Sequence, residues 1–136
     1  MILPRTILDT DILSAVMKRH PAAFVRAASY IATHGSLTIS IITRYEVRQG
    51  LLAKAAAIQT AAFDSFCSAA QILPIDDATI VLASELYAEL RAAGQIIGDA
   101  DILIAATALI HGCTLATNNV SHFARIPGLQ IDNWMH

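Results

Sequence analysis

Four acidic residues, from three widely separated stretches of the sequence, lie at or near the beginning or end of an apolar run. Asp9 closes the short run TILD, and Glu46 follows the β-branched run LTISI by a few residues. Asp99 and Asp101 stand directly ahead of the apolar run ILIAA. Two carboxylates about 5 Å apart repel each other by roughly 3 kcal/mol at an effective dielectric near 20. A cluster of carboxylates therefore either binds protons, which raises their pKa values, or holds a cation.

The ligand types in the sequence favour a hard divalent cation at such a cluster. The five histidines show no HxxxH or HExxH spacing, so a zinc site of that kind is not indicated. Carboxylate oxygens without convergent His or Cys favour Mg²⁺ (or Mn²⁺). Such an ion suits phosphodiester hydrolysis, because it activates water and stabilises negative charge on the phosphate oxygens.

The elements that must position these residues alternate between strand and helix along the chain. Strands are predicted at 6–9, 37–41, 71–75 and 114–117, with a possible fifth at 129–132. Helices are predicted at 11–18, 21–34, 43–52, 55–69, 77–93 and 101–111. This alternation predicts a single α/β domain over residues 1–136, a three-layer α/β/α sandwich with a central, mainly parallel sheet of four to five strands. Thr10 or Asp11 is expected to cap the first helix.

The predicted topology gives these distant residues a common location. In open parallel sheets, sites form at the carboxyl ends of strands, where loops lead into helices. Asp9 ends the first strand, Glu46 lies in the helix after the second, and Asp101 starts a helix. Asn118 and Asn119 directly follow the TLAT strand. We therefore expect them to converge on one edge of the sheet.

Composition limits the class of protein. The chain has 136 residues, 55% of them hydrophobic and 15% charged, which is typical of a folded domain with a substantial core. No apolar run approaches the roughly 20 residues of a membrane span, and no signal peptide is expected at the start. Cys67 and Cys113 have no metal-binding spacing and are interpreted as reduced thiols of a cytoplasmic protein.

Charge distribution is compatible with a nucleic-acid partner. The formal net charge is −2, but five of the 11 acidic residues fall in the stretches described above. The remaining six acids face nine Lys and Arg residues, so neutralising the acidic cluster with cations leaves a mildly basic surface. This balance permits RNA binding without demonstrating it.

Four stretches together resemble the PIN-domain family, and within it the VapC-type toxins of bacterial toxin–antitoxin pairs. In order, they are ILDTDIL, ISIITRYEVRQG, IGDADILIAATAL and LATNNVSHFARIPGLQIDNW. The resemblance spans Leu8 to Trp134. It implies an endoribonuclease with Mg²⁺ or Mn²⁺ at a carboxylate cluster. It further implies a homodimer held inactive by a VapB-type antitoxin, in a heterotetramer or larger assembly.

The resemblance also implies roles for individual residues. Asp9 and Glu46 match the family's first two acids, and Asp101 matches the acid of its D-x-x-IAA helix, so all three are expected to be catalytic and to ligate the ion. Asn119 falls where some members carry a fourth acid, and is expected to orient water or phosphate. Asp99 is expected to lie in the loop ahead of the helix, as a cap or an auxiliary carboxylate of the metal site.

Several of these residues have simpler structural interpretations. Asp9 at a strand end could serve only as a helix cap, and Asp11 is more typical of a cap than of a ligand. Thr43 is either the N-cap of its helix or a polar residue lining the site. His122 stands where related toxins often carry an acid, so it is not an outer carboxylate and could instead meet a phosphate or a partner chain.

Two other functions remain as alternatives. DTD after a strand resembles the nucleophile motif of haloacid-dehalogenase-like phosphatases, but position 13 is Leu where that pattern has Thr or Ser. The other alternative is a catalytically silent PIN-like binding module, against which the intact Asp9, Glu46 and Asp101 argue. A dinucleotide or ATP fold is not indicated, because neither GxGxxG nor a Walker loop occurs.

Overall fold

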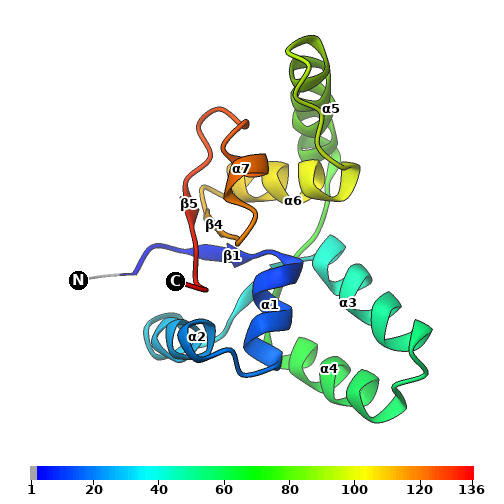
Figure 1. Ribbon diagram of the computed structural model, residues 1–136, viewed down its shortest axis with the longest axis vertical. Coiled ribbons are helices and arrows are strands. Elements are labelled where there is room, and N and C mark those ends of the chain that lie inside the picture. The colour runs from blue at the N-terminus through cyan, green and yellow to red at the C-terminus, as the bar shows by residue number, and fades with distance from the viewer. Residues whose placement is uncertain (1–2) are drawn as a thin grey trace.

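The computed structural model describes residues 3–136 and has a parallel sheet of five strands at its centre (Figure 1). The strands are β1 (Thr6–Leu8), β2 (Thr38–Ser40), β3 (Gln71–Leu73), β4 (Thr114–Ala116) and β5 (Ile131–Asp132). Their order across the sheet is β3-β2-β1-β4-β5, and every neighbouring pair is parallel. The predicted α/β sandwich is confirmed, with β1 at the centre of the sheet.

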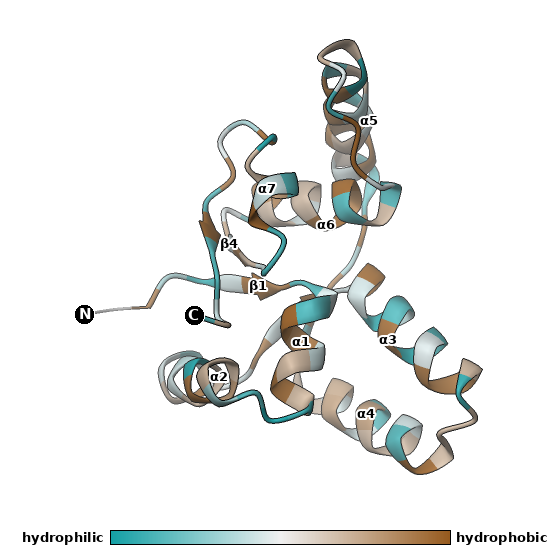
Figure 2. Cartoon of the chain, in the orientation of Figure 1, coloured by the Kyte–Doolittle hydropathy of each residue, from teal (hydrophilic) through white to brown (hydrophobic). Residues whose placement is uncertain are grey.

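The helices cover both faces of this sheet. They are α1 (Thr10–Met17), α2 (Pro21–His34), α3 (Ile41–Ala53), α4 (Ala57–Ala69), α5 (Asp77–Ala92), α6 (Asp99–Ile110) and α7 (Val120–Phe123). In Figure 1, α5, α6 and α7 lie on one side of β1, and α1, α2 and α4 lie on the other. Along α3 and α5, hydrophobic residues alternate with hydrophilic ones, as expected for helices with one face in the core (Figure 2). The layers follow from the alternation of side chains along each strand.

Two apolar clusters, one on each face, form the core. Ile7 and Leu115 pack with the buried residues of α5 and α6. Leu8 and Ala116, the next residues along the same strands, pack with residues of α1 to α4. No position of β1 is exposed, as expected for a central strand buried on both faces.

The local boundaries differ from the predicted ones in ways that matter for the site. Helix α1 is capped by Asp9, not by Thr10 or Asp11, and α3 begins at Ile41 with Ser40 as its cap. Helix α6 begins at Asp99, two residues earlier than predicted, so the expectation of a loop at Asp99 is wrong. In each case the helix begins before the first residue of the apolar pattern. The first-turn N–H groups are bonded or capped there by residues that the pattern does not include.

The short helix α7 was not predicted, since four residues carry too little periodicity to be recognised. Among the described residues, no helix is long and apolar enough to cross a membrane. Cys67 is buried, Cys113 is partly buried, and both thiols are free.

Strand register places several polar residues at one edge of the sheet. Leu8 pairs with Ile39 on one side and with Ala116 on the other. The residues that follow these three therefore leave the sheet at the same level. Asp9 leaves from β1 and Thr117 from β4, and the Asp9 backbone N–H donates to the Ala116 carbonyl at 3.0 Å.

Candidate active site

Asp9 lies at the centre of this edge and is nearly inaccessible to solvent, with 5% exposure. Its Oδ1 accepts a hydrogen bond of 2.8 Å from the backbone N–H of Ile12, which makes it the N-cap of α1. Burial raises its pKa to about 6, the neighbouring Thr117 hydroxyl and the Ile12 N–H oppose this rise, and the charges of Asp11 and Asp101 add to it. Asp9 is thus both a cap and a poorly solvated carboxylate beside other acids.

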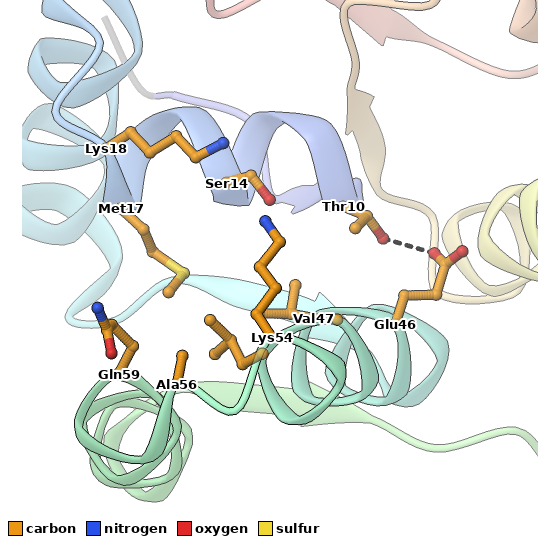
Figure 3. Close-up of a pocket in the computed structure, with 11 residues that line it drawn as sticks. Thr10, Ser14, Met17, Lys18, Glu46, Val47, Lys54, Ala56 and Gln59 are labelled. Atoms are coloured by element: carbon orange, nitrogen blue, oxygen red, sulfur yellow. Dashed lines mark hydrogen bonds between the residues drawn. The ribbon is translucent and has the colours of Figure 1, made fainter.

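Glu46 approaches the same edge from the second turn of α3. Its Oε1 accepts a short hydrogen bond of 2.6 Å from the Thr10 hydroxyl, which Figure 3 shows bridging α1 and α3. The Thr10 hydroxyl also lies 3.3 Å from the hydroxyl of the buried Thr43. The backbone N–H of Thr43 donates to the Ser40 hydroxyl. The interpretation of Thr43 as the N-cap of its helix is wrong, because Ser40 occupies the cap position and the Thr43 side chain is fully buried.

Asp101 comes from the first turn of α6 and is partly buried. Burial is the main cause that raises its pKa, and the charges of Glu46 and Asp11 raise it further. His122, when protonated, acts in the opposite direction. The charge of Asp101 acts on the pKa of Asp9, and that of Glu46 acts on the pKa of Asp101, which is consistent with three segments of the chain meeting at this edge.

Asn119 and His122 close the side of the site that follows β4. The backbone N–H of Asn119 donates to Thr117 Oγ1 at 2.9 Å, which holds the turn after the strand. Asn119 Nδ2 lies 2.8 Å from His122 Nδ1, within hydrogen-bond distance. His122 therefore contacts a site residue of its own chain.

Asp99 is separated from the other acids. Its exposed side chain lines a surface hollow with residues of α5, among them Ile80 and Tyr87, rather than the edge where Asp9 lies. Because successive helical residues are about 100° apart, Asp99 and Asp101 point in nearly opposite directions once both are helical. Asp99 therefore faces away from the edge where Asp9 and Asp101 lie.

The donor set fits a divalent cation held partly through water. Asp9, Glu46 and Asp101 supply only oxygens. Burial is the main cause that raises the pKa of Asp9 and of Asp101, and neighbouring acids add to it, so a cation at this edge would stabilise the ionised carboxylates. Within residues 3–136, no three acidic, His or Cys side chains are close enough to ligate one ion directly. Mg²⁺ usually keeps several waters and takes one or two protein carboxylates, which agrees with this spacing.

The whole chain has known relatives. The PIN domain family matches residues 6–129. The chain belongs to the PIN-domain family. The ribonuclease VapC2 of Rickettsia felis is 33% identical over 128 residues, which cover 93% of this chain and 96% of that protein. The tRNA(fMet)-specific endonuclease VapC of Shigella flexneri is 30% identical over 128 residues, with 93% and 96% covered.

A solved structure agrees with the sequence relatives. The VapBC2 complex of Rickettsia felis bound to a promoter DNA fragment contains a chain that superposes with a TM-score of 0.83. It is 32% identical, and the match covers 95% of this chain and 98% of that one. The resemblance inferred from the four motifs is confirmed, and the PIN-domain assignment leaves the phosphatase alternative without support.

Three residues of this PIN domain's site were not predicted as such. Thr10 positions Glu46, while Ser40 and Thr117 bind backbone N–H groups at the ends of β2 and β4. A Ser or Thr at or just after the end of a strand indicates a helix cap or a turn, because their hydroxyls bond nearby backbone groups. Their contacts with the acids, however, depend on strand order, which no local pattern contains.

Proposed function

We propose that this chain is a metal-dependent endoribonuclease toxin that hydrolyses phosphodiester bonds of RNA. The observation that carries the proposal is the convergence of Asp9, Glu46 and Asp101 at one sheet edge of a PIN domain, with the pKa values of Asp9 and Asp101 both raised. Within residues 3–136 these acids form no ion pair with Lys or Arg, and such carboxylates suit a site for Mg²⁺ or Mn²⁺. The relatives named as ribonucleases support the same reaction class.

Each residue has a distinct part in this proposal. When bound, the divalent ion supplies an activated water and stabilises negative charge on the phosphate. Asp9 and Asp101 would hold the ion, and Asp9 is kept in place by its cap bond to Ile12. Glu46 is aimed by Thr10 and would hold the ion directly or through one of its waters.

Asn119 completes the site with a neutral amide that orients water or a phosphate oxygen. Its amide is held by His122, and the turn beneath it by Thr117. Attack by water rather than by the ribose 2′-OH leaves a 5′-phosphate and a 3′-hydroxyl on the products.

The proposal includes a partner and a substrate class. Because the R. felis structure is a VapBC2 complex, we propose that a VapB-type antitoxin inhibits this chain in the cytoplasm. The assembly would be a homodimer of this chain with antitoxin, a heterotetramer or larger. The S. flexneri relative is named as specific for a tRNA, so tRNA or another structured RNA is the substrate class to test first.

The direct test is cleavage of total RNA by purified, antitoxin-free protein with Mg²⁺ or Mn²⁺. Cleavage is expected to stop with EDTA and to fall by at least a hundredfold in Asp101→Asn, which keeps the size of the side chain and removes its charge. Sequencing of RNA 5′ ends after induced expression then identifies the cut. Unchanged cutting by Asp101→Asn, or hydrolysis of small phosphoesters with none of RNA, would overturn the proposal.

A further inference from the structure

A groove of about 430 Å³ lies between α1, α3 and the start of α4. It begins at the Thr10–Glu46 hydrogen bond and runs along both helices away from the sheet (Figure 3). Its wall is mainly apolar, with Met17 from α1 and Val47 and Leu51 from α3. One end of the groove is therefore part of the candidate active site.

The other end of the groove is basic. The chain contains only two lysines, Lys18 and Lys54, and both line this groove. Both are exposed, and Figure 3 shows both side chains extending toward Ser14. Neither lysine forms an ion pair in residues 3–136, whereas Arg44 and Arg48 of α3 are paired with Asp64.

The spacing of the lysines from the site is the same on both helices. Lys18 is the C-cap of α1, eight residues after Thr10, and Lys54 is the C-cap of α3, eight residues after Glu46. At a rise of 1.5 Å per residue, each lysine lies about 12 Å along its helix from the hydrogen bond that joins Thr10 to Glu46. That distance corresponds to a few backbone phosphates of a nucleic-acid strand.

We propose that this lysine groove binds the RNA strand beside the bond that is cut. Lys18 and Lys54 contact backbone phosphates, and the apolar wall around Met17 and Leu51 packs against a base. The inference rests on the proposed function and deepens it. At the carboxylate end of the groove, an RNA strand is repelled by the acids unless a cation lies between them and the phosphates. At the other end, the unpaired ammonium groups of Lys18 and Lys54 attract the strand.

The charge arrangement favours RNA over a peptide as the occupant. A phosphate strand gains from both lysines and from the cation at the carboxylate end, so the whole length of the groove attracts it. An acidic peptide can also offer carboxylates at both ends, but it has no phosphodiester bond for the carboxylate end to hydrolyse, so the proposed activity favours RNA. Lysines at helix C-termini also stabilise the helix dipole, and the test must separate that effect from RNA binding.

The test measures binding of a single-stranded RNA oligonucleotide in EDTA, where no cleavage occurs. Lys18→Gln and Lys54→Gln are each expected to weaken binding about threefold to tenfold and to reduce the slope of log K against log salt by about 0.7. Arg91→Gln is the matched control, because Arg91 is a basic residue in the last turn of α5, far from the groove. It is expected to leave affinity and slope unchanged, although it removes the same kind of dipole interaction.

A second measurement uses the fact that the chain has only two lysines. Acylation with a lysine-specific reagent, read by mass spectrometry, is expected to decrease at both positions when the RNA is bound. Equal labelling with and without saturating RNA overturns the inference. So does a Lys18→Gln/Lys54→Gln double variant that binds RNA as the wild type does, or protection by a polyglutamate peptide but not by RNA.

Failure of the inference and failure of the proposed function are distinguishable. In the first case, wild type and double variant cleave RNA with the same KM and kcat. In the second, RNA binds and protects the lysines, but no condition with Mg²⁺ or Mn²⁺ yields cleavage. If the inference and the proposed function are both correct, KM of the double variant is expected to be at least tenfold higher than that of the wild type, with little change in kcat.

Discussion

The Thr10 hydroxyl donates a 2.6 Å hydrogen bond to Oε1 of Glu46, and this contact joins the first turn of α1 to α3. Thr10 directly follows Asp9, the cap of the same helix. The cap bond that fixes the start of α1 therefore also fixes the hydroxyl that aims Glu46. Two acids that are 37 positions apart in the sequence are positioned by one turn of helix.

Thr10→Val is expected to reduce kcat for RNA cleavage about tenfold while leaving the fold intact. Valine keeps the size and β-branching of threonine but cannot donate to Glu46, and hydrogen bonds to charged groups contribute about 1.5–3 kcal/mol. A factor of ten corresponds to about 1.4 kcal/mol of transition-state free energy. Thr10→Ser, which retains the hydroxyl, should recover most of the rate; equal rates for the two variants would contradict the positioning role.

The pH dependence of stability should carry the signature of Asp9. Its pKa is raised from 3.8 to about 6 in the folded protein, so between these pH values the folded state holds a proton that the unfolded state has lost. In metal-free buffer the free energy of unfolding should thus fall as pH rises from about 4 to 6, by up to about 3 kcal/mol. Urea denaturation across this range in EDTA measures the slope.

Asp9→Asn is the control for this slope. The amide oxygen can still accept the cap bond from Ile12, but it does not titrate, so the Asp9 contribution should vanish and the variant should exceed wild type at pH 7.5 without metal. Mg²⁺ should raise the melting temperature of the wild type above pH 6, where Asp9 is ionised, and have little effect on the variant. A variant less stable than wild type at pH 7.5 in EDTA would show that burial of the Asp9 charge is not costly.

The central parts of the fold follow from patterns that local sequence contains. Apolar alternation and β-branched runs predict the strands, and the long periodic stretches predict α2 and α5 close to their observed bounds. The convergence of Asp9 with Asp101 follows from the rule that sites form at the carboxyl ends of parallel strands. None of these inferences requires knowledge of a specific contact.

Other features depend on tertiary structure and were missed or misplaced. The start of α6 at Asp99 moved that carboxylate to the α5 side, because one extra half-turn of helix reverses the direction of a side chain. The Thr10–Glu46 contact requires α1 and α3 to lie side by side, which depends on the order β2-β1 in the sheet. The Asn119–His122 pair lies in a turn and a short helix with no periodic signal.

His122→Ala should move the acid limb of the cleavage rate profile to higher pH. The protonated imidazole lowers the pKa of Asp101, against the burial and the acidic neighbours that raise it. Removing the imidazole lets the pKa of Asp101 rise further, so Asp101 ionises only at higher pH. Measurement of kcat/KM from pH 5 to 8 tests this shift. Arg125→Ala removes a cation that is not among the charges acting on the pKa of Asp101, so it should leave the limb in place. An unshifted limb in His122→Ala would exclude coupling to Asp101.

Tyr30→Phe should destabilise the protein without touching the site. The side chain is 1% exposed, and its hydroxyl accepts a 3.1 Å hydrogen bond from the backbone N–H of Thr6, at the start of the central strand. Phenylalanine keeps the packing in the core but leaves this buried donor without an acceptor, which costs about 1–3 kcal/mol. Tyr45→Phe is the matched control, since that ring is 62% exposed and its change should stay within about 0.5 kcal/mol. If urea denaturation finds the two variants equally stable, the Tyr30 hydroxyl does not hold the start of β1, and water must satisfy Thr6 in its place.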